Sequence, residues 1–518
     1  MRLGRRTDGT EKPPRPGRRQ FLQALLGGLL IVLLAAGATA AVTKKKVGAE
    51  LKPFLQSRSP TIKTKKHTLE IPKPGKAQTI LILGSDHRYG DGKGEARSDT
   101  IMLLRLDPKQ AATTMLSIPR DLKVTIPGHG LAKINDAYTF GGPDLTVQTI
   151  TALTGLKINH VVNVQFKGFR KAIDQIGCVY TDVDRRYYHS NVGLGIGQRY
   201  SEIDLQPGYQ KLCGTDALSY VRFRHTDSDI VRGARQQDFL RAIKDQVSAS
   251  ALFGQRKKLE TIFGDNTEVD KDLKTYNGLV RVLKLALFSA GHPVRQVQFP
   301  AVFDKEVLPG GAEIDYVLAS PASVTRTVED FMHPPKDKAP AAPATKKPAK
   351  GKGKKKAAAA VTVPGIIDAR ALSRQAIATA KITTPLSIPL YYPTHLTELS
   401  RYGTEDTLRT YRLRDRAGRS HEAYRMVVIA NEQEGQYYGV QGTDWRSPPL
   451  LQAKHTMRTV HGRRLALYRD GSRLRFVSWR TASAVYWVSN TLSLKLTNAQ
   501  MLEIASTLSR RSAGSASP

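Results

Sequence analysis

The sequence is poor in cysteine and in acidic residues. It has 2 Cys, and its 45 Asp+Glu face 80 Lys+Arg, which gives a formal net charge of +35. Neither cysteine has a histidine at a metal-ligand spacing, so a zinc site is not expected. The Gly-rich phosphate loop of nucleoside triphosphatases is also missing, which argues against nucleotide hydrolysis. The excess of basic residues instead predicts a polyanionic partner such as nucleic acid, anionic lipid or phosphorylated glycan.

The absence of charge over residues 21–42 predicts a membrane segment. At about 1.5 Å per residue, this helix would span about 30 Å, the thickness of a bilayer core. The basic tail 1–20 predicts a cytoplasmic N-terminus, with the rest of the chain outside the cytoplasmic membrane. Arg18-Arg19 and Ala38-Thr39-Ala40 allow the alternative of a cleaved twin-arginine signal. Both alternatives export the bulk of the chain, which argues against nucleic acid as a partner.

Export places the two cysteines in an oxidising compartment. A Cys178–Cys213 disulfide is therefore favoured over two buried free thiols. The bond would close a loop of about 35 residues and stabilise the folded state by about 3 kcal/mol.

Changes in composition divide the chain into parts. After the tail 1–20 and the apolar segment 21–42, the sequence predicts a polar stalk over 43–75 and a globular α/β domain over 76–332. Residues 333–363 are rich in Lys, Pro and Ala and predict a disordered linker. A second exported domain over 364–510 and a disordered tail over 511–518 follow.

Short apolar runs alternate with helical patterns in the first domain. Strands are predicted over 78–86, 100–108, 113–121 and 160–165, and helices over 143–155, 167–177 and much of 234–290. This alternation predicts an α/β layered fold.

In the second domain, strand-like pieces recur at hairpin spacing over 423–490, and a closing helix over 498–511 starts at an Asn498 cap. We expect an α+β fold dominated by antiparallel sheet. It offers no convergent acid/base set, so a binding or positioning role is the default interpretation.

Charged residues follow or precede several predicted strands. They are Asp86 and Arg88, Arg97 and Asp99, Arg120 and Asp121, and the arginines of YVRFRHTDSDIVRGARQQ (220–237) with Asp227 and Asp229. Two carboxylates on neighbouring loops suit Mg²⁺, and several guanidinium forks suit phosphate oxygens. Each motif alone is more often a turn with a local ion pair. Together, on an exported α/β domain, they favour transfer chemistry at a pyrophosphate.

The segments ILILGSDHR, ARSDTIMLLRLDP, MLSIPRDLKVTIPGHGLAKINDAYTFGGP and DALSYVRFRHTDSDIVRGARQQDFLRAI follow one another between about 78 and 245. In this order they resemble the LytR-CpsA-Psr (LCP) family of bacteria. The resemblance implies an extracytoplasmic α/β domain with a central sheet flanked by helices. It also implies binding of polyprenyl-pyrophosphate-linked glycan and transfer of the glycan phosphate to peptidoglycan, assisted by Mg²⁺ or Mn²⁺.

The resemblance also implies roles for individual residues. Asp86 and Asp99 would hold the metal, and Asp229 would orient the arginines or act as the base. The arginines implied to grip the pyrophosphate are Arg88, Arg120, Arg224 and Arg232, of which Arg120 is counted with Asp229 as catalytic. Arg97, Arg222 and Gln236 would complete the shell, whereas Lys133 and Asn135 are expected to be structural or rim residues.

One segment departs from the family pattern. Residues 228–232 read Ser-Asp-Ile-Val-Arg where the family often has Gly-Asp-Phe-Gly-Arg, although the spacing of Asp and Arg is kept. The apolar segments 144–166 and 236–250 are candidates for a groove that holds an isoprenoid tail, or for ordinary core.

Two other functions use the same residues. A polyprenyl-pyrophosphate binder or a pyrophosphatase without transfer would need the same arginines and metal. A membrane-anchored transcriptional regulator is less favoured, because the predicted topology places the basic domains on the side of the membrane away from DNA.

Overall fold

The computed structural model describes residues 61–65, 68–86, 98–110, 113–193, 202–223, 229–247, 258, 262, 264–289, 294–297, 299, 302–307, 313–334, 363–403 and 407–511. The tail 1–20, the apolar segment 21–42, most of the predicted linker and most of the C-terminal tail lie outside these residues. Within the part of the chain that is described, no helix is long and apolar enough to cross a membrane.

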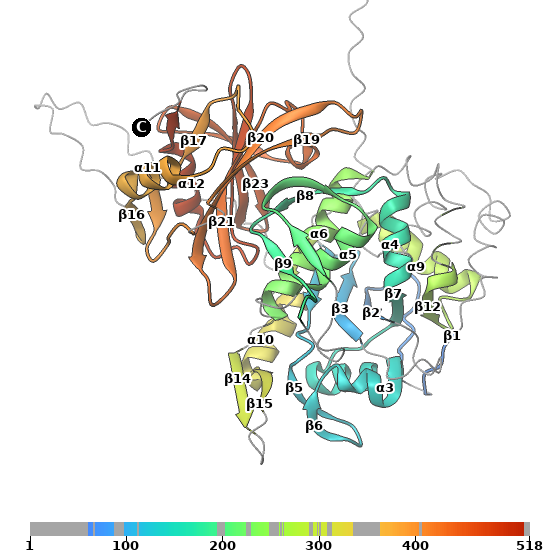
Figure 1. Cartoon of the computed structure of the whole chain (residues 1–518). Helices are drawn as coiled ribbons and strands as arrows, with labels where there is room; N and C mark the ends of the chain where they lie inside the picture. The colour runs from blue at the N-terminus through green and yellow to red at the C-terminus, as the bar shows by residue number, and fades with distance from the viewer. Residues whose placement is uncertain are drawn as a thin grey trace, which may run out of the picture.

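A mixed seven-stranded sheet organises the first domain (Figure 1). Its order is β1 (Thr61–Ile62), β12 (Thr267–Asp270), β7 (His160–Gln165), β2 (Gln78–Ser85), β3 (Ser98–Leu106), β4 (Thr113–Ser117) and β13 (Val294–Val297). β2 runs parallel to β7, whereas β3 is antiparallel to both β2 and β4. The four strands predicted from apolar runs are therefore neighbours in the sheet.

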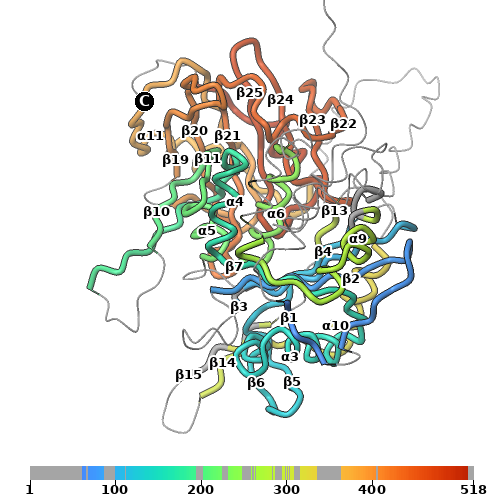
Figure 2. The backbone as a smooth tube through the Cα atoms, turned by 90° about the vertical axis from the view of Figure 1, so that its right-hand side faces the viewer, coloured from blue at the N-terminus to red at the C-terminus, as the bar shows by residue number. Residues whose placement is uncertain are grey.

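Helices cover both faces of this central sheet. They are α3 (Asp136–Thr154) and α10 (Pro321–Met332) on one face, and α4 (Phe166–Gln175), α5 (Gly214–Arg222), α6 (Asp229–Gln246) and α9 (Tyr276–Ser289) on the other. Side chains alternate along each strand, as the period of two requires. Leu104 of β3 belongs to the same buried cluster as Phe239 of α6, whereas its neighbour Leu103 belongs to the cluster that contains Val147 of α3. This is the predicted α/β layered arrangement, and Figure 2 shows the helices above and below the strands.

Two sequence predictions for this domain were wrong in part. The predicted stalk 43–75 already contains β1, and the Glu70 amide donates to the carbonyl of Ile158, two residues before β7. The segment 234–290 was predicted to be helical, but it contains β12, which pairs with β7. Both strands are short and β12 carries two acidic residues, so tertiary pairing rather than a local pattern makes them strands.

The two cysteines form a disulfide, as their predicted oxidising compartment suggested. Cys178 precedes β8 (Val179–Val183) and Cys213 follows β11 (Gly208–Leu212), and these two strands pair antiparallel. The disulfide therefore closes the open end of this β8–β11 pair, directly before α5 begins at Gly214.

Three smaller two-stranded pieces complete the described part of the domain. They are β5 (Lys123–Ile126) with β6 (Gly130–Lys133), β9 (Tyr187–His189) with β10 (Ile203–Leu205), and β14 (Val302–Val307) with β15 (Glu313–Leu318).

The C-terminal domain is built on an antiparallel seven-stranded sheet, as predicted. Its order is β19 (Leu408–Arg414), β20 (Ser420–Asn431), β21 (Gln436–Thr443), β25 (Val485–Ser489), β24 (Arg473–Arg480), β23 (Arg463–Asp470) and β22 (Thr456–Val460). Around it lie β16 (Ile366–Asp368), α11 (Arg370–Thr379), β17 (Leu390–Tyr392), β18 (His395–Thr397), the 3-10 helix η2 (Pro449–Gln452), α12 (Asn498–Ser506) and β26 (Ser509–Arg511).

The closing helix differs from its prediction at both ends. α12 is capped by Thr497, whose side chain and that of Gln500 form a capping box, and not by Asn498. The Asn498 side chain instead accepts from the Leu474 amide, which ties the helix to β24. The helix stops at Ser506, and residues 509–511 pair as a strand with β17.

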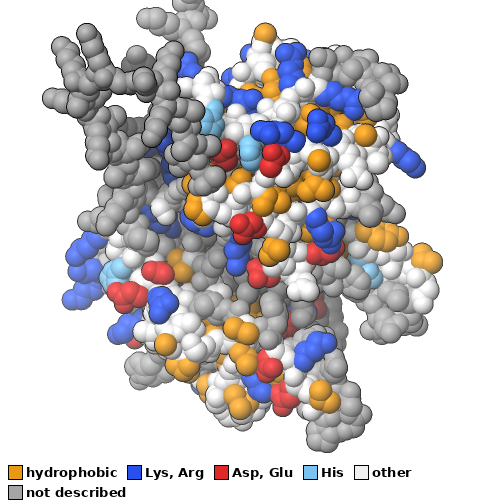
Figure 3. All heavy atoms as spheres, turned by 90° about the vertical axis from the view of Figure 1, so that its left-hand side faces the viewer, with side chains coloured by type: hydrophobic (Ala, Val, Ile, Leu, Met, Phe, Trp, Pro, Cys, Tyr) orange, Lys and Arg blue, Asp and Glu red, His pale blue; other side chains and the backbone are white. Residues whose placement is uncertain are grey.

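Charged side chains do not cluster in one area of the face shown in Figure 3. Basic, acidic and apolar side chains are interspersed over the described part of this face. On the described part of this face, the Lys and Arg side chains therefore form no continuous basic stripe.

We expect loss of the disulfide to destabilise the folded chain. Replacing both Cys178 and Cys213 by Ala reopens a loop of 35 residues. The free energy of unfolding should fall by about 3–4 kcal/mol because the unfolded chain gains conformational freedom. Urea unfolding of the oxidised wild type and the double variant measures the change. Equal midpoints would contradict the prediction.

Candidate functional site

One edge of the central sheet collects the ends of the strands that the sequence singled out. β2, β7 and β4 end at this edge and β3 begins there, because β2 and β7 are parallel and β3 is antiparallel to both β2 and β4. Asp86 follows the end of β2, Asp99 is the second residue of β3, and Arg120 follows β4. The topology thus brings three candidate segments to one place.

A β-bulge lies at Asp99. Gly84 pairs with Thr100, but the next residue, Ser85, pairs with Ser98, so Asp99 is an extra residue in β3. Gly84 permits the close approach of the strands, since a Cβ there would lie 3.0 Å from the Thr100 Cβ. Bulges are frequent beside functional sites, where they change the direction of a side chain. Asp86 is exposed, whereas the side chain of Asp99 lies outside the described atoms.

The Ile-Pro-Arg-Asp turn separates a structural residue from a candidate site residue. Asp121 is buried, lies 3.1 Å from the Lys133 Nζ, and accepts the Val317 amide at its backbone carbonyl. Lys133 is thus a structural residue, as expected. Arg120 is half-buried, with its Nε 3.7 Å from the same carboxylate.

The junction between α5 and α6 fixes the remaining part of the site. Arg222 is the last residue of α5, and Phe223 is extended with ψ 133°. The next helix, α6, begins at Asp229, five residues before the segment 234–290 that was predicted to be helical. The last carbonyls of a helix have no partner within it.

Side chains of α6 supply the missing donors to the end of α5. Arg235 donates through Nη1 to the carbonyls of Tyr220 and Phe223, each at 2.8 Å. Gln236 donates to the Val221 carbonyl at 3.1 Å and to the Thr100 hydroxyl at 3.0 Å. Gln236 therefore joins α5, α6 and β3 in a single contact.

Arg235 is a structural arginine, although it belongs to the arginine-rich stretch 220–237. Its side chain is 0% exposed, and its guanidinium lies 4.6 Å from the ring centre of Tyr187. Burial raises the pKa of the neighbouring Tyr187 and Tyr220, which keeps both phenols neutral. The composition of this stretch does not separate Arg235 from the site arginines, whereas the family resemblance left it out of the site.

The described site arginines are held in different ways. The guanidinium of Arg222 stacks 4.0 Å from the ring centre of Phe166, the first residue of α4. Arg232 is 4% exposed on the first turns of α6, beside Gly233, which allows α6 to approach Ser117 of β4. The positions of Arg88, Arg97 and Arg224 lie outside the described residues, and for Asp229 only the backbone is described.

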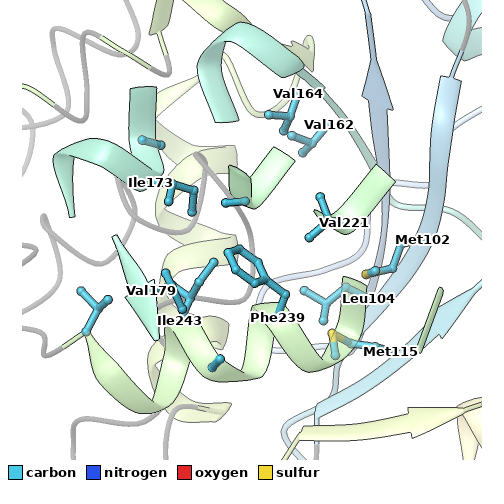
Figure 4. Close-up of a cluster of buried hydrophobic side chains, with 14 of the residues drawn as sticks. Met102, Leu104, Met115, Val162, Val164, Ile173, Val179, Val221, Phe239 and Ile243 are labelled. Carbon is cyan, nitrogen blue, oxygen red and sulfur yellow. The ribbon is translucent and has the colours of Figure 1, made fainter. Parts of the chain in front are cut away.

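An apolar cavity of about 110 Å³ opens next to these residues, between the central sheet and α4, α5 and α6. Its polar lining comes from Thr100, Arg222 and Gln236. The apolar lining comes from Ile82, Leu83, Met102, Val164, Phe166, Phe169, Ala172, Ile173, Ile176, Leu218, Val221, Phe239, Leu240 and Ile243. Figure 4 shows Phe239 and Ile243 of α6 among the surrounding side chains of this face.

Parts of both candidate groove segments line this cavity. Val164 and Phe166 from the first segment line the cavity, as do Phe239 and Ile243 from the second. The helical part of the first segment, including Val147, packs on the opposite face of the sheet and forms ordinary core.

Among the described residues, two groups bring three potential metal-ligand atoms close together. One contains the disulfide cysteines Cys178 and Cys213, so it offers no thiolate. The other is His160 with Asp270 and Asp272, in which Asp270 already accepts the amides of Val161, Asp272 and Leu273. Both arrangements are structural, and neither includes Asp86.

The comparison with protein families settles the family of the chain. A model of the LytR_cpsA_psr family matches residues 41–318. The chain belongs to the LytR-CpsA-Psr family.

The match with curated relatives covers most of the length of each relative. The polyisoprenyl-teichoic acid–peptidoglycan teichoic acid transferase TagU of Oceanobacillus iheyensis is 30% identical over 323 residues, 59% of this chain and 97% of the relative. The transferase TagT of Bacillus subtilis, which carries the same description, is 31% identical over 264 residues, 50% of this chain and 81% of the relative. Among solved structures, "TagT bound to LIIa-WTA" matches at 27% identity and a TM-score of 0.38, covering 51% of this chain and 92% of that one.

The site of this LytR-CpsA-Psr protein includes residues that the sequence did not single out. Thr100 shares a hydrogen bond with Gln236, and Phe166 supports Arg222. Thr100 directly follows Asp99, and Phe166 directly follows β7, so their positions at strand ends were the available signal.

We expect Arg235→Met to lower stability by about 3 kcal/mol. The substitution leaves the buried carbonyls of Tyr220 and Phe223 without their donor, and unsatisfied buried polar groups are costly. Urea unfolding measures the loss. Arg370→Met, at a position 61% exposed, serves as the control and should change stability by less than about 1 kcal/mol. Equal losses in both variants would contradict a specific role for Arg235.

Proposed function

We propose that the chain transfers a glycopolymer phosphate from a polyprenyl-pyrophosphate carrier to peptidoglycan. One observation carries the proposal: an apolar cavity whose polar lining is Thr100, Arg222 and Gln236, next to Arg232. An isoprenoid tail suits the apolar lining, and a pyrophosphate suits the arginines. Membership of the LytR-CpsA-Psr family and the descriptions of TagU and TagT support this choice.

In this reaction a hydroxyl of the acceptor sugar attacks the phosphorus that carries the glycan. The new bond joins the acceptor oxygen to that phosphorus, and the bond to the bridging oxygen breaks. Polyprenyl monophosphate leaves with the bonding electron pair, and the proton of the hydroxyl passes to Asp229. The site arginines would bind the pyrophosphate oxygens and stabilise the charge that develops on the leaving group. They are Arg88, Arg97, Arg120, Arg222, Arg224 and Arg232.

We propose that Asp86 and Asp99 would hold a divalent metal, Mg²⁺ or Mn²⁺, at this edge of the sheet. Asp86 follows the end of β2, and Asp99 lies at the bulge of β3, which pairs with β2. Carboxylate oxygens are the preferred ligands of such ions. When bound, the metal would add positive charge beside the phosphates. The chain would be anchored in the bacterial cytoplasmic membrane through residues 21–42, with both domains outside.

The transfer reaction is tested with the purified full-length chain, lipid-linked glycan and peptidoglycan oligomer. Asp99→Ala and Arg232→Lys should each lower conjugate formation by about a hundredfold or more, because each removes a group that stabilises the transition state. Arg326→Ala, an exposed arginine on α10, is the control and should retain wild-type activity. Unchanged conjugate formation in both site variants would refute the site. Phosphate release without conjugate would replace transfer by pyrophosphatase activity.

The cavity is tested by filling it. Ala172→Leu places a larger side chain into the lining on α4 and should raise KM for the lipid-linked glycan by about tenfold, because the tail loses space. Ala137→Leu overpacks the opposite face of the sheet and controls for destabilisation alone. Equal KM values for these two variants would mean that the cavity does not hold the tail.

A further inference from the structure

α6 has two faces with different neighbours. Gln236, Phe239 and Ile243, spaced by three and four residues, line the cavity of the candidate site. Asp238 and Arg241 lie on another side of the helix, where they contact strands of the C-terminal domain. Figures 1 and 2 show α6 between the central sheet and the C-terminal domain.

Buried ion pairs connect α6 with β23 and β24. The Arg241 Nη2 lies 2.6 Å from the Asp470 Oδ2, with side chains 8% and 5% exposed. The Arg475 Nη2 lies 2.6 Å from the Asp238 Oδ1, and Asp238 also faces Arg241 at 3.4 Å. The four side chains alternate in charge. Asp238 is 25% exposed, whereas the other three side chains are at most 8% exposed. Removing Asp238 would take this ion-pair partner from the buried Arg475, and such losses are costly.

A second contact fixes the end of α6 through the disulfide-closed β8–β11 pair. The Gln246 side chain bonds both the amide and the carbonyl of Tyr180 in β8. Asp182 of the same strand accepts from Trp487 at 3.0 Å and pairs with the fully buried Arg425 at 3.3 Å. Burial raises the pKa of Asp182, whereas Arg425 and the Trp487 N–H lower it. Asp182 is thus bound by Trp487 and Arg425 of the C-terminal domain, although burial outweighs both and leaves its pKa raised.

Aromatic rings extend this second contact. Tyr209 of β11 meets Trp487 edge to face at 5.5 Å, and its hydroxyl accepts the Leu450 amide. Tyr180 meets Trp445 edge to face at 5.1 Å. These rings belong to one buried cluster that includes side chains of both domains.

The cavity explains why α6 needs support from outside. Protein interiors are close-packed, and atoms that line a void lack contacts on that side. Gly233 contacts β4 closely, and Gln246 hydrogen-bonds to β8. Between these two residues, α6 lines the cavity instead of packing fully on the sheet. The ion pairs with β23 and β24 contact the helix along this same stretch, at Asp238 and Arg241.

We propose that the C-terminal domain is a brace that sets the position of α6, with Asp238, Arg241, Asp470 and Arg475 as positioning residues. Through α6 the brace fixes the width of the cavity and the placement of Arg232 and Gln236. The proposal rests on the proposed function, because the cavity is taken to bind the polyprenyl chain. It gives the C-terminal domain a role in lipid binding without a direct contact to substrate.

A double-mutant cycle in the full-length chain tests the brace. Asp238→Asn, Arg475→Gln and the double variant are compared for affinity to a fluorescent prenyl pyrophosphate and for hydrogen exchange of the α6 amides. Each single variant should bind the prenyl pyrophosphate on the order of tenfold more weakly than the wild type, and its α6 amides should exchange faster. Because both substitutions break the same contact, the affinity of the double variant should be no lower than that of the weaker single variant. Arg475→Lys, which keeps the charge, should bind closer to wild type.

Lys495→Glu is the matched control, since Lys495 and Glu434 form an exposed pair in the same domain, and it should leave affinity unchanged. A lowered melting temperature with wild-type affinity in both single variants would overturn the brace, as would effects that multiply in the double. If the wild type binds no prenyl pyrophosphate, the proposed function fails. In that case, hydrogen exchange of the α6 amides is the remaining test of the brace. Exchange rates equal to those of the wild type in both single variants would overturn it.

Discussion

The capping of α5 by α6 is the interaction on which the candidate site depends. A helix that ends inside a protein leaves carbonyls that need donors, and here Arg235 and Gln236 supply them from the next helix. Arg222 ends the capped helix, and Arg232 lies one turn before Arg235. Because Gln236 also bonds Thr100, the same contact joins both helices to β3 beside the bulge.

Arginines of one sequence stretch have different physical roles. Arg235 is fully buried and serves the backbone, whereas Arg222 stacks on Phe166 at the cavity. A planar guanidinium with five donors suits both tasks, so composition alone does not distinguish them. The same holds for the carboxylates, since Asp121 pairs with Lys133 while Asp86 is exposed at the strand end. Burial and partners decide the role of each charged residue.

The sequence predicted the elements whose signals are local. The apolar runs of β2, β3, β4 and β7 and the antiparallel C-terminal sheet follow from hydrophobic periodicity. It did not predict β12, whose identity as a strand comes from pairing with β7. The bulge at Asp99, the helical state of Arg222 and the cap at Thr497 also depend on partners distant in the chain or on exact hydrogen-bond geometry. Asp86, Asp99 and Arg120 were found from their positions at strand ends, and the candidates on α5 and α6 from the family resemblance. The supporting side chains of Thr100, Phe166 and Arg235 were not found.

The contact between Asp182 and Trp487 joins residues 305 positions apart. During synthesis, the first domain is complete long before the last strands of the C-terminal sheet leave the ribosome. Until they arrive, the aromatic rings of β8 and β11 and Asp238 of α6 lack their partners in the C-terminal domain and face solvent. Long-range contacts of this kind form late, and the apolar surface that they will cover stays exposed and prone to aggregation until then. The two domains are therefore interdependent in folding, and a chain cut short before β25 would present an unfinished apolar surface rather than an intact smaller enzyme.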